Sequence, residues 1–68
     1  MDWKAETLAG ARRARMQANN LHHNIDDLKC GLHNLEGYAS ECALMEDAIT
    51  IIEDMVEDLF KIEGKLSR

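Results

Sequence analysis

The stretch CALMEDAITIIEDMVEDLFKIEGKL, residues 42–66, decides the fold. Its apolar residues recur at alternating intervals of three and four, which is the spacing of a heptad repeat along one side of an α-helix. Glu63 is the one residue out of place in this row. The sequence therefore predicts a helix that packs along another helix. The members of this first apolar row are Cys42, Met45, Ile49, Ile52, Val56, Leu59 and Leu66.

A second apolar row lies beside the first on the same predicted helix. One packed neighbour covers one row, so two rows predict two neighbours, the second of them at a dimer interface. The members of this second apolar row are Leu44, Ala48, Ile51, Met55 and Ile62. The opposite side of the helix is acidic, and we call it the acidic face. Its members are Glu46, Asp47, Glu53, Asp54, Glu57 and Asp58.

The first half of the chain predicts a long helix over about residues 3–36. Asp2 is a suitable N-cap, and Glu6 suits the positive end of the helix dipole. Asn19, Asn20 and Asn24 leave open a break near residues 19–24, although the apolar row keeps its phase through them. The apolar row of this helix is Leu8, Ala11, Ala14, Ala18, Leu21, Ile25, Leu28, Leu32 and Leu35.

Residues 37–40, Gly-Tyr-Ala-Ser, predict the turn between the helices. Gly37 suits the left-handed position after a helix end. Ser40 suits the N-cap of a second helix over about residues 41–65, with Glu41 in its first turn. When the chain is folded at 38–39, the apolar row of the first helix faces the first apolar row of the second helix, and Ala14 lies opposite Glu63.

The predicted fold is a single all-α domain over residues 1–68, an antiparallel helical hairpin. A two-helix hairpin cannot cover the second apolar row, so we expect a homodimer that forms a four-helix bundle. The alternative is a short N-terminal helix followed by one long helix through Gly37, paired as a coiled coil.

Composition narrows the class of protein. A chain of 68 residues buries only roughly 60% of its unfolded surface and is marginally stable alone. Two cysteines do not make a disulfide framework, and no apolar segment suits a signal peptide or a membrane span. We therefore expect a cytoplasmic protein with free thiols. The net charge of −5 argues against binding to DNA or to an anionic membrane.

No arrangement of residues predicts catalysis, a cofactor or a complete metal site. His22 with Asp26 and His23 with Asp27 are spaced i,i+4, as two metal ligands on one helix can be. No third or fourth ligand follows from the sequence, so we expect no enzyme and no bound metal. A metal-binding helical bundle stays as an alternative.

Three arginines, Arg12, Arg13 and Arg15, form a short basic patch that is a candidate nucleic-acid contact. The competing interpretation is that they pair with acidic side chains of the second helix, because antiparallel helices bring them level with Glu63.

In general plan, as a dimeric helical hairpin of similar length, the chain resembles the small plasmid-encoded RNA-binding proteins of the Rop type. That resemblance implies an RNA-binding regulator, but it transfers no functional residue. The acidic charge favours a protein partner over nucleic acid. We therefore expect a small interaction protein that binds and inhibits or regulates a larger protein with a basic groove, as phage and mobile-element accessory proteins do. The acidic face is the predicted protein-binding site.

Overall fold

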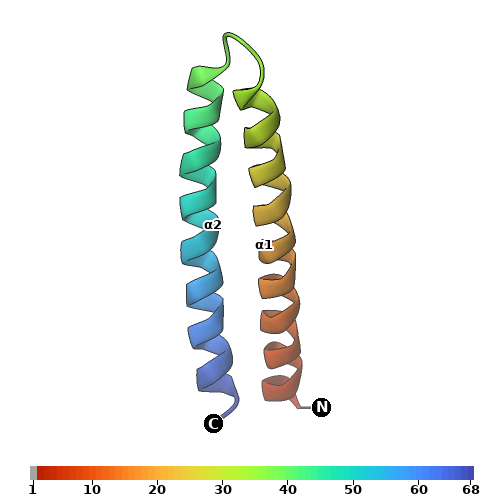
Figure 1. Ribbon diagram of the computed structural model, residues 1–68. Coiled ribbons are helices and arrows are strands. Elements are labelled where there is room, and N and C mark those ends of the chain that lie inside the picture. Colours follow the sequence, from red (N-terminus) through yellow and green to blue (C-terminus); the bar gives the residue numbers. More distant parts are fainter. Residues whose placement is uncertain (1) are drawn as a thin grey trace.

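The computed structural model describes residues 2–68 and shows two helices, α1 (Trp3–His33) and α2 (Ala39–Leu66), packed antiparallel (Figure 1). The turn lies at one end of the hairpin and both ends of the chain lie at the other (Figure 1). The molecule is long and narrow, with Cα extents of 54 × 15 × 12 Å. The prediction of an all-α helical hairpin is confirmed. No helix within the described part of the chain is both long and apolar enough to cross a bilayer.

The N-terminus of α1 is capped as the sequence predicts. The carboxylate of Asp2 accepts hydrogen bonds from the backbone N–H groups of Lys4, at 3.0 Å, and Ala5, at 3.2 Å. These bonds satisfy two of the donors that the first turn of a helix leaves free. The helix then runs without interruption through residues 19–24, so the asparagines there do not break it.

The turn follows the prediction at Gly37 and departs from it at Ser40. Gly37 has a φ of +88°, the left-handed conformation that glycine adopts without steric cost. However, α2 begins at Ala39 with Tyr38 as its N-cap, so Ser40 lies inside the first turn. The reason is the first helical hydrogen bond, which runs 3.0 Å from the Cys42 N–H to the Tyr38 carbonyl. Tyr38 makes no side-chain cap.

The first helix ends at His33, before residues 34–36, which were predicted to be helical. Because the chain turns between residues 34 and 38, the alternative of one long helix through Gly37 is wrong.

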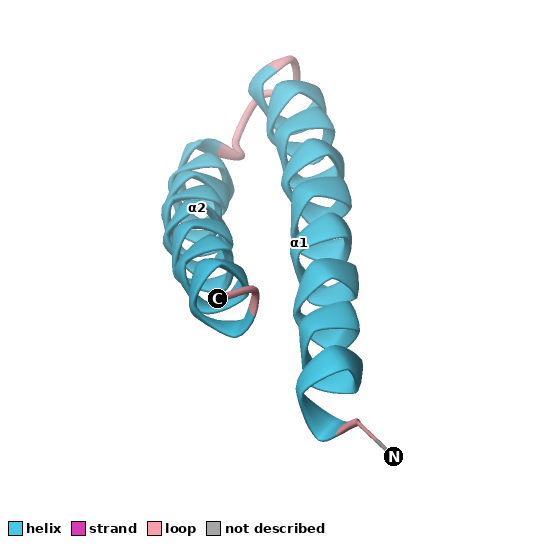
Figure 2. Cartoon of the chain, turned by 90° about the horizontal axis from the view of Figure 1, so that it is seen from below, coloured by secondary structure: helices cyan, strands magenta, loops and turns pink. Residues whose placement is uncertain are grey.

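The core is the narrow strip where α1 and α2 touch. Ala18 and Ile52 are the hydrophobic residues buried there, and the other members of the first apolar row of α2 are half-buried. On α1, Leu21 and Leu28 are about half exposed, because they lie to one side of that strip, and Leu35 in the turn is 57% exposed. Viewed end-on, the outer surfaces of both helices are open, with no further element of residues 2–68 over them (Figure 2).

Candidate functional site

The interruption in the first apolar row is occupied by an ion pair. Glu63 is only 8% exposed, and its carboxylate accepts two hydrogen bonds from the guanidinium of Arg15, one from Nε and one from Nη2 at 3.2 Å. The Nε atom of Arg12 lies 3.7 Å from the same carboxylate. The hydrogen bond and, less strongly, the charge of Glu63 raise the pKa of Arg15. A buried carboxylate is costly unless it is paired in this way.

Further polar contacts join the helices on the side of Arg15. The guanidinium carbon of Arg15 lies 5.6 Å from the ring centre of Phe60, a cation–π distance. One heptad further along α1, His22 Nε2 lies 3.2 Å from a carboxylate oxygen of Glu53.

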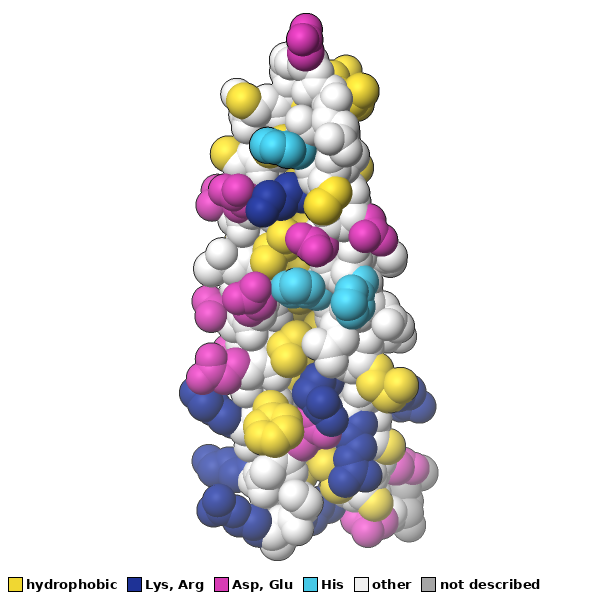
Figure 3. All heavy atoms as spheres, viewed as in Figure 1, with side chains coloured by type: hydrophobic (Ala, Val, Ile, Leu, Met, Phe, Trp, Pro, Cys, Tyr) yellow, Lys and Arg dark blue, Asp and Glu magenta, His cyan; other side chains and the backbone are white. Residues whose placement is uncertain are grey.

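After another heptad on α1, Lys29 Nζ lies 3.3 Å from a carboxylate oxygen of Glu46. Figure 3 shows this side of the hairpin, with His, Lys and Arg side chains over the junction of the helices. We call this side the polar side; its cross-helix contacts are Arg15 with Phe60, His22 with Glu53, and Lys29 with Glu46.

The other side of the hairpin is apolar and exposed, and we call it the apolar side. Ile52 points into the core, and its two chain neighbours flank it, because successive helical residues are about 100° apart. Glu53 therefore lies on the polar side and Ile51 on the apolar side. Ile51 and Leu44 are each 60% exposed, and Met55 and Ile62 are each 46% exposed.

The apolar side is hollowed between the helices around the middle of the hairpin. A hollow of about 480 Å³ lies there, and small alanine side chains form part of its wall. The lining residues are Ala14, Gln17, Ala18 and Leu21 of α1, with Met55, Asp58, Leu59 and Ile62 of α2. The structure thus brings two members of the second apolar row, Met55 and Ile62, together with Leu21 from the other helix.

The structure exposes every residue of the acidic face. Half of these carboxylates have a basic side chain close by: Glu46 has Lys29, Glu53 has His22, and Glu57 has Lys61 at 3.4 Å. Ion pairs at this level of exposure contribute little to stability. Asp47, Asp54 and Asp58 have no cationic side chain within ion-pair distance among residues 2–68.

The three arginines of the basic patch take different positions. Arg12 and Arg15 pair with Glu63, as the competing interpretation predicts, whereas Arg13 is exposed. The helix does not bring further ligands to the His/Asp pairs. Among residues 2–68, no group of three or more His, Cys, Asp or Glu side chains is placed to hold a metal ion.

The polar side was not predicted as a unit, although the sequence carries a signal for it. Arg15, His22 and Lys29 are spaced by seven residues, and so are Glu46, Glu53 and Phe60. Charged residues in heptad register beside an apolar row are typical of contacts between paired helices. The seven-residue spacing of the charged residues beside the apolar row is therefore the signal that predicts these contacts.

Comparison with family models, with curated proteins and with solved structures finds no significant match to this chain. The surfaces of the hairpin are therefore the guide to its function.

Proposed function

We propose that this chain is a non-catalytic interaction module that pairs with a second copy through its apolar side and binds a larger, basic protein through its acidic face. The observation that carries the proposal is the contrast between the two sides of the hairpin. Polar contacts join the helices on one side, while large aliphatic side chains remain exposed on the other.

Self-association follows from the exposed apolar side chains. A chain of this length has a small core, and here the hydrophobic residues buried among 2–68 are Ala18 and Ile52 alone. Exposed Leu44, Ile51 and Met55 lie in one row, and covering them would supply the burial that the single hairpin lacks. A second hairpin has a matching row, so a homodimeric four-helix bundle covers both.

Most of the acidic face remains outside such a bundle. Asp58 borders the hollow of the apolar side, and the other members lie away from both the core and that side. Asp47, Asp54 and Asp58, which have no cationic neighbour, make it an exposed negative surface. A basic groove is its natural complement, and binding there would block or regulate the larger protein. This is how phage and mobile-element accessory proteins act on host enzymes, and we place the chain among them. The free thiols of Cys30 and Cys42 suit a cytoplasmic location.

Charge reversal tests the acidic face. The partner is first captured with the wild-type chain in a pull-down. Its binding is then measured by surface plasmon resonance against a variant with Glu53, Asp54, Glu57 and Asp58 all changed to lysine. We expect unchanged helicity, a slower association rate and an affinity weakened about tenfold or more. Unchanged affinity contradicts the proposal. The matched control reverses the charge of three exposed carboxylates outside the acidic face: Glu6, Asp26 and Asp27.

An RNA-binding regulator is the second candidate, because Arg13 is exposed and basic side chains gather around the chain termini (Figure 3). An RNA binder shifts RNA on a gel and loses affinity steeply as salt rises. An Arg13→Glu variant weakens that shift if RNA is the ligand. If the wild-type chain shifts no RNA at low salt, RNA binding is excluded and protein binding is the candidate function that is left.

A further inference from the structure

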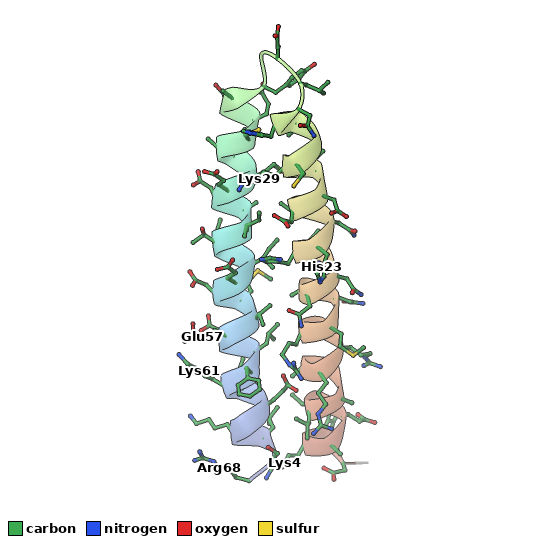
Figure 4. All side chains as sticks on the ribbon, viewed as in Figure 1. Lys4, His23, Lys29, Glu57, Lys61 and Arg68 are labelled. Carbon is green, nitrogen blue, oxygen red and sulfur yellow. The ribbon has the colours of Figure 1, made fainter. Side chains whose placement is uncertain are left out.

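Folding segregates charge along the hairpin. The third of the molecule next to the chain termini, residues 2–16 and 61–68, holds seven basic and three acidic side chains, a formal charge of +4. The third next to the turn, residues 27–50, holds one basic and five acidic side chains, a charge of −4. The middle third holds five acidic side chains and no basic one. Figure 4 labels Lys4, Lys61 and Arg68 at the terminal end, far from Lys29 near the turn.

This segregation distinguishes the two ways in which identical hairpins can pack face to face about a two-fold axis. In one arrangement both turns lie at the same end, so +4 lies beside +4 and −4 beside −4. In the other arrangement the copies run end for end, so the terminal third of each copy lies beside the turn third of the other. Opposite charges then meet at both ends of the bundle, and like-charge contacts there are removed.

We propose that the occupant of the apolar side is a second copy of this chain packed end for end, with the turn of each copy beside the chain termini of the other. This inference rests on the self-association proposed above and adds its orientation. The consequence for function is that the acidic faces of the two copies run in opposite directions on the outside of the bundle.

One spin label on each chain tests the orientation by pulsed electron paramagnetic resonance. In a Cys30→Ser, Cys42→Ala background, the label is attached at Ser40→Cys next to the turn or, separately, at Ser67→Cys near the C-terminus. Both positions are exposed. End-for-end packing places identical labels roughly 35–50 Å apart at either site, from a rise of 1.5 Å per residue. Packing with the turns together leaves them roughly 10–25 Å apart, the span of a few adjacent helices.

Each outcome decides the question. Long distances at both sites support the proposal, and short distances at both overturn the orientation while leaving the dimer in place. A monomer mass with no dipolar modulation overturns the dimer as well, so the two failures are distinguishable.

Charge exchange provides an independent measurement on the same labels. Changing Lys61, Lys65 and Arg68 to glutamate turns the terminal third from +4 to −2, and we expect loss of the long-distance peak. Adding Glu36→Lys, Glu41→Lys and Asp47→Lys turns the other end to +2 and restores that peak. A peak that is unaffected by the first set of changes contradicts the role of charge.

Discussion

Arg15 of α1 donates two hydrogen bonds to Glu63 of α2 at the position where the first apolar row is interrupted. The residue that breaks the heptad pattern is therefore a specific cross-helix contact. An ion pair within an apolar strip disfavours other registers of the two helices, because a shift would leave the buried carboxylate without its partner.

The Glu63→Gln variant tests this contact. Glutamine has nearly the same shape but no charge, so the hydrogen bonds from Arg15 weaken and Arg12 loses its ionic partner. We expect the free energy of unfolding in urea to fall by about 1–3 kcal/mol. The control is Glu57→Gln, which removes an exposed pair with Lys61 and should change stability by less than about 0.5 kcal/mol. Equal losses of unfolding free energy in the two variants would show that the Glu63 ion pair stabilises the fold no more than an exposed pair does.

The pH dependence of the Arg15 contribution has a defined sign. Glu63 raises the pKa of Arg15 above the ordinary arginine value. The stabilisation is therefore fully present below that ordinary value and is lost only as the pH rises through the higher folded pKa. The difference in unfolding free energy between wild type and Arg15→Met should therefore stay constant between about pH 6 and 10. A difference that declines across this range shows that another titrating group is involved.

A substitution at Gly37 measures the effect of backbone strain on stability separately from the effect of packing. A Cβ at this position meets no atom within 4 Å, so the cost of Gly37→Val comes from its φ of +88° alone. We expect a loss of about 1 kcal/mol or more in thermal or urea unfolding. Gly31→Ala is the matched control, since its Cβ is equally unobstructed but the site is helical. That substitution should stabilise by up to about 1 kcal/mol. Destabilisation by both would implicate packing.

Ile51 and Ile52 are adjacent in sequence and differ in what they contact. Ile52 is buried between the helices, so Ile52→Ala should lower the unfolding free energy by about 2–4 kcal/mol, even at concentrations where the chain is monomeric. Ile51 is 60% exposed in the hairpin, so Ile51→Ala should act chiefly on the dimer dissociation constant. Urea unfolding at several protein concentrations distinguishes them. Similar concentration dependence for both would contradict the separate roles.

Much of the fold could be predicted from the sequence, because its signals are local and periodic. The rows of three- and four-residue spacing gave both helices, and Gly37 gave the turn. The start of α2 could not be predicted to the residue. The hydrogen bond from Cys42 to Tyr38 begins the helix at Ala39, before Ser40 can act as its N-cap. Competition of this kind is decided by the geometry of the whole turn.

The surfaces were less predictable than the helices. The second apolar row and the acidic face follow from helical periodicity, and the structure exposes Ile51 and Asp54 as expected. The polar side depends on which residues of two helices lie level, so His22 and Glu53 could be matched only once the register was known. The gathering of basic side chains at one end likewise requires the chain to fold back on itself.

The molar mass in solution is the direct measurement of whether a second copy covers the apolar side of the hairpin. Light scattering coupled to size-exclusion chromatography at micromolar concentration should give twice the chain mass of 7.7 kDa for the wild type. Ile51→Asp should give a monomer or an unfolded chain, because it would bury an unpaired carboxylate, whereas Thr50→Asp, on the exposed side of α2, should remain dimeric. A folded wild-type chain of 7.7 kDa at that concentration would show that no second copy covers the apolar side.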